Sequence, residues 1–498
     1  MPRKLITLTA LALVVCLLLI WNSPGPDTIP ITTRSATALI HFTEGRNLFE
    51  QNRKIAAESS LHKALDLDPR LAMAHLYLSR IQTNGNEARN SLARAVSLAN
   101  EVSDGERLMI LADRAGSFQQ PARQHELLSK LTETYSGDAR VHLELGLYFF
   151  RLKHWDSAII SYSRAVALSP TYASAYNGMG YCYRFLGNLC AAEECFLNYM
   201  SLIPDAPNPY DSYADLLTKM NRHREAIQFY KEALKVQPDF VASHLGIANN
   251  LCVLGQHKEA REQLGHLLEI AWNDDQRRAA LQGIMMSYLD QGNFEAAFEQ
   301  FETAHQIAIA AADTVAMAQD LDAMGKMWLE IDRSEEASKA FTASLNLIVL
   351  SAVAPSVAEQ AQLDHYQRQA LVWLQRGNIV QAQDIIQQYQ AEALRTKDQN
   401  RIQTAHETLG RIALESGDIQ QAIKELSESD LEQALNQYYL ALAYEVAGDL
   451  PQALRLYIKA STYDQFGRLG QAFVRQKALR RVESLRLVQE PHQEVPVL

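Results

Sequence analysis

The chain has 498 residues, of which 47% are hydrophobic and 21% are charged, and its formal net charge at pH 7 is −11. This acidic balance argues against nucleic acid as the main partner, because a surface that binds nucleic acid needs an excess of Lys and Arg. The length alone would suggest about three domains, but a regular internal repeat favours one continuous array of small units.

The first residues differ from the rest of the chain. Arg3 and Lys4 precede an uncharged, apolar run over residues 5–21 that ends on Trp21. This pattern is typical of a secretory signal or of a single membrane anchor. Because no A-x-A-like cleavage site follows, we interpret residues 1–22 as an uncleaved anchor helix; the alternative is an exported, soluble chain after signal cleavage. The positive flank predicts a single-pass membrane protein whose remaining residues lie on the periplasmic or extracytoplasmic side.

After a linker over residues 23–37, the chain repeats with a period of 34 residues. The clearest residues at this spacing are Ala158, Ala192, Ala226 and Ala260; Tyr162, Phe196, Tyr230 and Leu264; and Pro170, Pro204 and Pro238. A fixed period of this size indicates a repeat architecture, in which each unit buries its apolar face against its neighbours.

One unit of the repeat, residues 139–172, shows two helical patterns. Gly146 and Phe149 lie on one face of a first helix, and Ala158 and Tyr162 lie on one face of a second. Small residues on these faces allow the backbones to approach closely, and the aromatic side chains fill the space between them. A proline at the end of the unit, which has no N–H to donate, then stops the second helix.

These residues resemble the tetratricopeptide repeat, whose pattern is W-x2-L-G-x2-Y, then A-x3-F, then A and P. Three consecutive units between residues 139 and 240 match it, and weaker copies extend the pattern to about twelve units over residues 38–467. The resemblance implies an all-α fold, a right-handed superhelical solenoid. We expect a regular block over residues 38–274 and a degenerate block over residues 275–467, which lacks the closing proline and should therefore have longer helices.

The end of the chain has a different pattern. Residues 468–488 combine an apolar stripe with basic residues, which favours a helix that caps the solenoid with a polar outer face. The residues expected on that outer face are Arg475, Lys477, Arg480, Arg481 and Arg486. A basic patch that binds nucleic acid or lipid is the alternative interpretation. Residues 489–498 contain two prolines and are expected to be disordered.

Motifs that carry catalytic chemistry are missing from the sequence. It contains no phosphate-binding loop, no dinucleotide fingerprint, no H-E-x-x-H and no C-x-x-C. The repeats also leave no stretch of about 100 residues for a separate catalytic domain. We therefore expect no enzyme activity, no catalytic residues, no metal site and no cofactor.

The resemblance also implies where a partner would bind. In the family the first helices of successive units line a concave groove that grips an extended or helical segment of a partner. The positions of this chain that match the groove positions are Arg140, Leu143, Leu147, Phe150, Asn177, Tyr181, Arg184, Asp211, Asp215, Thr218 and Asn249. For any single residue, an ordinary solvated position on a helix is an equally good interpretation.

These observations predict a non-catalytic scaffold or adaptor that is anchored in the membrane and binds a protein or peptide segment. A small molecule is not expected as the ligand. The alternative is a periplasmic carrier or assembly factor that binds a glycan or a lipid-linked precursor. Such a carrier should line its groove with aromatic residues and few charges, and Arg184, Asp211 and Asp215 argue against it.

Overall fold

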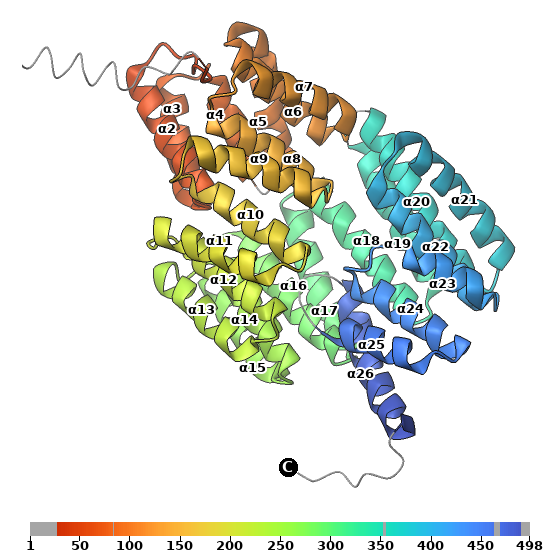
Figure 1. Ribbon diagram of the computed structural model, residues 1–498. Helices are drawn as coiled ribbons and strands as arrows, with labels where there is room; N and C mark the ends of the chain where they lie inside the picture. The colour runs from red at the N-terminus through yellow and green to blue at the C-terminus, as the bar shows by residue number, and fades with distance from the viewer. Residues whose placement is uncertain (1–26, 83, 352–354, 463–468, 490–498) are drawn as a thin grey trace, which may run out of the picture. The chain divides into compact units, whose positions relative to one another are not determined.

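The computed structural model describes residues 27–82, 84–351, 355–462 and 469–489, and these residues form helices joined by short turns (Figure 1). In chain order the helices begin with α2 (Ala36–Glu50), α3 (Lys54–Leu67), α4 (Ala72–Ile81), α5 (Gly85–Leu98), η1 (Ala99–Glu101), α6 (Asp104–Ser117), α7 (Pro121–Thr134), α8 (Ala139–Arg151), α9 (Trp155–Leu168), α10 (Ala173–Phe185), α11 (Leu189–Leu202), α12 (Pro207–Lys219) and α13 (His223–Val236). They continue with α14 (Val241–Val253), α15 (His257–Ile270), α16 (Asp274–Asp290), α17 (Phe294–Ala310), α18 (Thr314–Glu330), α19 (Ser334–Leu350), α20 (Pro355–Gln375), α21 (Ile379–Thr396), α22 (Gln399–Glu415), α23 (Ile419–Ser427), α24 (Ala434–Ala447), α25 (Leu450–Ser461) and α26 (Leu469–Gln489).

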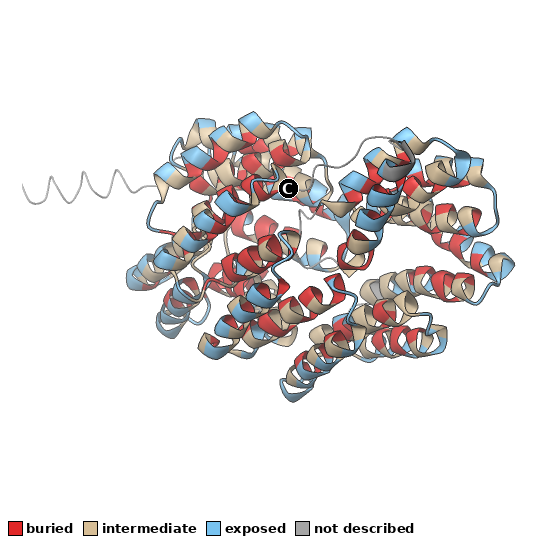
Figure 2. Ribbon diagram, turned by 90° about the horizontal axis from the view of Figure 1, so that it is seen from below, coloured by how far each residue is buried: buried red, intermediate tan, exposed pale blue. Residues whose placement is uncertain are grey.

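Each helix packs mainly against the helices next to it in the chain, which is the contact pattern of a repeat solenoid. Even-numbered helices come first in each helical pair and odd-numbered helices second, as in α8 with α9 and α12 with α13. Buried residues gather on the helix faces that meet, and exposed residues lie on the outer faces (Figure 2). The prediction of an all-α solenoid is therefore confirmed for the described residues.

The described helices form two compact units. Unit 1 contains the described residues up to Ile81 together with Arg89–Cys182, and unit 2 contains Gln82–Ala88 together with the described residues from Tyr183 onward.

The core of unit 1 shows why the 34-residue spacing produces close helix packing. Tyr162 is fully buried. A Cβ added to Gly146 would lie 2.4 Å from Cε1 of this ring, and a Cβ added to Gly178 would lie 2.6 Å from its Cζ. Only glycine therefore fits on both sides of the aromatic ring, as the sequence pattern indicated for Gly146.

The turn inside each of these repeats contains a residue in the left-handed backbone conformation. Lys153, Gly187, Asn221 and Gly255 have φ values of 60°, 76°, 58° and 78°. They are spaced by 34 residues, so one backbone conformation recurs at this turn. Glycine adopts it freely, and asparagine is among the other residues that tolerate it best. The turn is thus part of the repeat even where its residue type changes.

Prolines stop the second helices of the regular repeats, as predicted. Helices α9, α11 and α13 end at Leu168, Leu202 and Val236, each two residues before a proline. Where this proline is missing the helix lengths vary: α16 to α19 have 17 residues each, whereas α8 to α15 have 13 or 14. The second helices α23 and α25, which also lack it, have only 9 and 12 residues, so the expected lengthening holds for part of the degenerate block.

The predicted single-pass localisation is contradicted. Within the described ranges, no helix is long and apolar enough to cross a bilayer. The longest helices, α20 and α26, have 21 residues each and carry charged side chains along their length. The apolar run over residues 5–21, on which the anchor prediction depended, lies outside the described residues, as does most of the tail over residues 489–498.

Candidate binding surfaces

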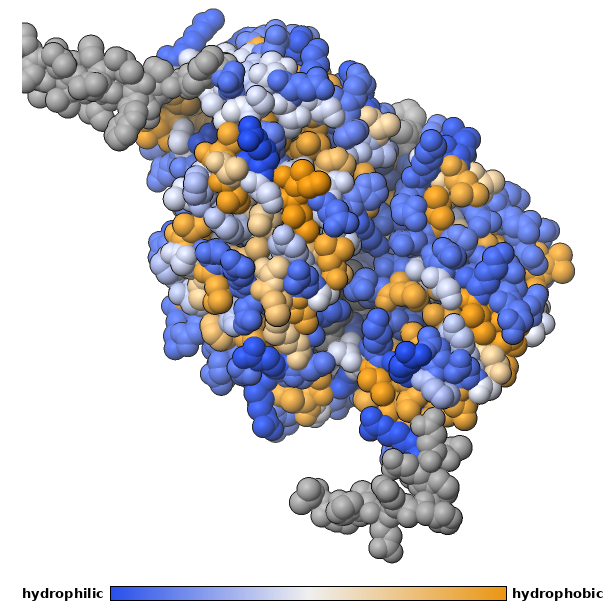
Figure 3. Space-filling model, viewed as in Figure 1, coloured by the Kyte–Doolittle hydropathy of each residue, from blue (hydrophilic) through white to orange (hydrophobic). Residues whose placement is uncertain are grey.

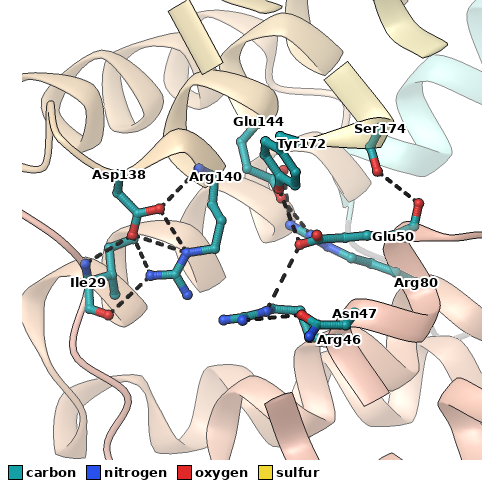
Figure 4. A network of polar contacts seen from close by, with 10 residues as sticks. All are labelled: Ile29, Arg46, Asn47, Glu50, Arg80, Asp138, Arg140, Glu144, Tyr172 and Ser174. Carbon is teal, nitrogen blue, oxygen red and sulfur yellow. Dashed lines mark hydrogen bonds and ion pairs between the residues drawn. The ribbon is translucent and has the colours of Figure 1, made fainter. Parts of the chain in front are cut away.

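In unit 1, the predicted groove residue Arg140 holds the start of the described chain. Its Nε lies 2.8 Å from Oδ1 of Asp138, the residue that caps the N-terminus of α8, and its Nη2 donates to the carbonyl oxygen of Ile29 at 3.2 Å (Figure 4). Burial raises the pKa of Asp138, but hydrogen bonds from Arg140 and from the Ile29 N–H outweigh it and hold this pKa below its ordinary value. Arg140 is therefore already engaged within the chain.

A second polar contact joins the end of α2 to the start of α10. Oε1 of Glu50 accepts a hydrogen bond from the Tyr172 hydroxyl at 3.2 Å, and the Glu50 carbonyl oxygen accepts one from Ser174 Oγ at 2.8 Å (Figure 4). Arg46 Nε lies 4.0 Å from the same carboxylate. Burial raises the pKa of Glu50 above its ordinary value, although Arg46 and Tyr172 act in the opposite direction.

Arg80 forms ion pairs with two acidic residues on neighbouring first helices. Its Nε and Nη2 donate to the Asp113 carboxylate at 2.6 and 2.8 Å. Its Nη1 donates to Glu144 at 2.7 Å (Figure 4). Burial opposes ionisation of Arg80, but the two carboxylates raise its pKa well above the ordinary value. The sequence analysis missed Glu50, Arg80 and Glu144, because the repeat pattern does not specify which residues pair across helices.

The other predicted groove residues of unit 1 have different environments. Leu143 is buried in the core, whereas Leu147 is 37% exposed. Phe150 is half-buried and packs edge-to-face on Trp155. Tyr181 and Asn177 are half-buried on α10.

In unit 2, the predicted residues Asp211 and Asp215 belong to one buried cluster on α12. Asp211 accepts a hydrogen bond from Ser243 Oγ at 2.7 Å, and Asp215 accepts one from the Tyr230 hydroxyl at 2.6 Å. Burial, and then the charge of Asp215, raise the pKa of Asp211 well above its ordinary value.

The first helix of the following repeat, α14, carries two neighbouring asparagines that differ in their hydrogen bonding. Asn250 exchanges hydrogen bonds with Thr218 at 3.0 and 3.2 Å and contacts His223 Nδ1 at 2.8 Å. Asn249 is only 3% exposed, and its Oδ1 has no hydrogen-bond donor among the described residues. Arg184, at the end of α10, is also buried, with its guanidinium over the ring of Phe185.

The Asn249 oxygen is one of several buried acceptors that have no hydrogen-bond donor among the described residues. In the described part of the chain, seven buried side-chain oxygens of Asn, Gln and Asp have no donor, and all of them lie on first helices. They are Oδ1 of Asn177, Asn249, Asp290 and Asn436 and Oε1 of Gln360, Gln375 and Gln403. An unsatisfied buried acceptor costs about 1–3 kcal/mol relative to one that is hydrogen-bonded.

The C-terminal helix α26 lies against the first helices of unit 2. It packs on α16 and α18 as well as on α24 and α25 (Figure 1). Arg475, expected on the polar outer face of a capping helix, is instead buried with 5% exposure. Its Nη1 donates to Oδ2 of Asp290 at 2.7 Å and its Nη2 donates to the Val253 carbonyl oxygen at 2.9 Å, so these acceptors explain its inward orientation.

Apolar contacts and further ion pairs complete the docking of α26. Its residues Ala472, Phe473 and Val474 share a buried cluster with Met285, Met286, Leu289 and Met327 of α16 and α18. Lys477 pairs with Glu330 at the end of α18, and Arg481 pairs with Glu445 of α24 at 3.2 Å. Residues farther along α26, from Ala478 to Leu485, pack instead in the cluster formed with α24 and α25.

Comparisons with known proteins agree with the repeat pattern. Sequence models described as tetratricopeptide repeat match residues 111–173, 173–205, 217–284 and 407–465. Mouse superkiller complex protein 3 is 23% identical over 215 residues, which are 42% of this chain and 14% of that protein. Drosophila melanogaster protein O-mannosyl-transferase Tmtc1 is 33% identical over 90 residues, which are 18% of this chain and 10% of that protein. The chain thus spans a small part of the length of these relatives.

Solved structures with the same kind of repeat are also similar. A tetratricopeptide repeat protein from Parabacteroides merdae is 16% identical, with a TM-score of 0.36, and the alignment covers 52% of this chain and 98% of that one. YrrB, described as a TPR protein with an unusual peptide-binding site, is 19% identical, with a TM-score of 0.26, and the alignment covers 36% of this chain and 91% of that one.

Proposed function

We propose that this chain, which belongs to the tetratricopeptide repeat family, is a non-catalytic scaffold that holds a segment of a partner protein on its first helices. The observation that carries the proposal is the docking of α26. The first helices α16 and α18 already accept a helix with an apolar stripe and a buried arginine. Recognition of a helix in a groove uses the same chemistry when the helix comes from a partner.

The first helices α12 and α14 supply the groups that a peptide requires. Asp211 and Asp215 accept hydrogen bonds, and Asn249 presents a buried amide oxygen without a donor. A backbone N–H of a partner segment would satisfy Asn249, and that gain does not depend on the partner's side chains. The sequence-specific part of recognition would then come from neighbouring apolar positions.

A peptide fits these surfaces better than a glycan or a lipid-linked precursor does. Carboxyl and amide groups, rather than a row of aromatic rings, occupy the predicted groove positions of α12 and α14. On the face drawn in Figure 3, hydrophobic residues are interspersed with hydrophilic ones. Three relatives, among them Drosophila melanogaster Tmtc1, are O-mannosyl-transferases by name, but the aligned parts cover only 10% to 18% of the length of these proteins.

The proposal is tested with peptides selected from a random display library on the full chain. We expect Asn249→Ala to weaken the selected peptides by about 1–2 kcal/mol, roughly 5- to 30-fold. The variant should be no less stable, because it removes an acceptor that has no donor in the free chain. Asn198→Ala, on the exposed face of the second helix α11, is the matched control. Equal losses for both variants, or no loss for either, would refute binding on the first helices.

A further inference from the structure

The face of α16 and α18 beneath α26 has a feature that its present occupant does not use. Arg475 Nη1 donates to Oδ2 of Asp290, and the same oxygen is also 2.8 Å from His257 Nε2. Oδ1 of Asp290 is buried and has no hydrogen-bond donor among the described residues. An arginine that approached with two parallel N–H groups would use both oxygens, which is the stronger geometry for this pair.

From this we propose that the face of α16 and α18 is an exchange site: a basic amphipathic helix of a partner protein, with an arginine placed for Asp290, displaces the first half of α26. This inference rests on the proposed function, since it names the regulation and the partner chemistry of the same first-helix surface. The first half of α26 is Leu469–Lys477, and its second half, from Ala478 onward, stays packed on α24 and α25.

The charge of the face fits a basic helix. Asp290 and Glu330 receive two basic residues from the first half of α26, which are Arg475 and Lys477. Opposite charges of this kind set the register of a helix and speed its association. A partner helix with a similar spacing of arginines and lysines therefore fits, and an acidic helix does not.

The apolar part of the face suits more than one ligand. Met285, Met286 and Met327 supply three flexible side chains around the position of Phe473. Methionine adapts to differently shaped partners, and it is frequent on surfaces that bind several helices. The face can therefore repack around a partner's aromatic or aliphatic residue after Phe473 leaves.

The energetics also favour exchange over permanent docking. The Arg475–Asp290 pair is almost fully buried, with exposures of 5% and 1%, and the desolvation of such a pair offsets most of its attraction. Opening the face to solvent would leave Asp290 without its arginine, but exchange replaces one arginine by another. Because α26 is covalently linked, a partner competes against an effective concentration in the millimolar range, so α26 lowers the partner's apparent affinity.

The experiment uses a fluorescent synthetic peptide with the sequence of residues 469–486, added to the full-length chain and followed by anisotropy. We expect weak binding to the native chain and binding that is about tenfold tighter or more to Arg475→Ala, in which α26 docks less firmly. The peptide keeps its own arginine for Asp290. Adding Asp290→Asn to that variant should remove the gain. Arg480→Ala, exposed on the same helix, is the control and should match the native chain.

Hydrogen exchange of the native chain gives a second, independent readout. The amides of Leu469–Lys477 should exchange faster than those of the second half of α26, and the peptide should increase the difference. Equal affinity of the peptide for the native chain and Arg475→Ala, or binding that survives Asp290→Asn, would overturn the proposal. Such a failure would leave the Asn249→Ala result unaffected, because Asn249 lies on α14, outside the face of α16 and α18 that the peptide tests.

Discussion

Gly246 is the position where the packing of a repeat is most directly testable. A Cβ at this site would lie 2.4 Å from Cζ and 2.5 Å from Cε1 of Tyr230, closer than real Cβ contacts allow. The ring has little freedom to move, since Tyr230 is 2% exposed and its hydroxyl donates to Asp215 at 2.6 Å. We expect Gly246→Ala to force the ring away from Asp215.

The expected loss of stability combines two destabilising contributions and one that offsets them. Overpacking of a core costs about 1–3 kcal/mol, and a lost hydrogen bond adds about 1 kcal/mol. Alanine is favoured over glycine inside a helix by about 1 kcal/mol, which partly offsets the loss. The net destabilisation should be about 1–3 kcal/mol. Gly265→Ala is the matched control, because Gly265 lies within α15 and a Cβ there meets no atom within 4 Å, so this variant should gain stability.

The assay compares urea unfolding of both variants, followed by far-UV circular dichroism, with amide hydrogen exchange of α13 and α14. Hydrogen exchange is needed because a repeat array can unfold in parts. The loss of amide protection should be concentrated in α13, which carries Tyr230, and in α14, which packs against its ring. If Gly246→Ala were as stable as Gly265→Ala, the close approach of α14 to Tyr230 would not be a constraint on this fold, and the packing argument would be refuted.

Two further predictions concern ionisable groups. Since the folded-state pKa of Glu50 is raised above 4.5, the folded chain holds more protons than the unfolded chain between pH 4.5 and this raised pKa, and its unfolding free energy falls as the pH rises through that window. Glu50→Gln should therefore be more stable than the native chain at neutral pH and lose this advantage below pH 4.5. A constant difference in pH-dependent urea titrations would contradict this prediction, and Glu44→Gln, at an exposed position, is the control. Burial raises the pKa of Cys195 and of Cys252 to about 11 each, and Cys182 is also buried, while Cys190 is exposed. In a Cys16→Ser background, a thiol reagent at mildly alkaline pH should modify Cys190 at once and the buried thiols only after urea is added. Rapid modification of a second thiol would show that the core around α10, α11 or α14 opens in the native state.

The sequence predicted those features of the fold that depend on neighbouring helices. The period of 34 residues identified Tyr162 as a core residue and Gly146 as its close neighbour, because such contacts recur in every unit. The turn conformation recurs as strictly, but Lys153 and Asn221 stand where Gly187 and Gly255 stand in other units, so the residue type alone did not reveal it.

Contacts between elements that are far apart in the chain were not predictable in the same way. Glu50 and Tyr172 are 122 residues apart, and Asp290 and Arg475 are 185 residues apart. Neither pair follows a period, since each occurs once. The buried state of Arg475 was missed for this reason, because a basic residue on a terminal helix is ordinarily exposed unless a buried carboxylate faces it. The binding roles of Asn177, Tyr181, Arg184, Asp211, Asp215 and Asn249 remain predictions that the peptide experiments address.

The distribution of unsatisfied acceptors indicates which surfaces have capacity for a ligand. In unit 1, Arg80 pairs with both Asp113 and Glu144, so an incoming charged group would have to break existing ion pairs. Buried oxygens that no described donor reaches lie on Asn177 in unit 1 and on Asn249 and Asp290 in unit 2. Replacing Asn249 by an apolar side chain of similar size would remove an unsatisfied acceptor, whereas the same change at Asp290 would take the carboxylate away from Arg475 and His257. We propose that a donor of a partner satisfies these oxygens, in which case the free energy that the unbound chain forgoes there contributes to the affinity of the complex.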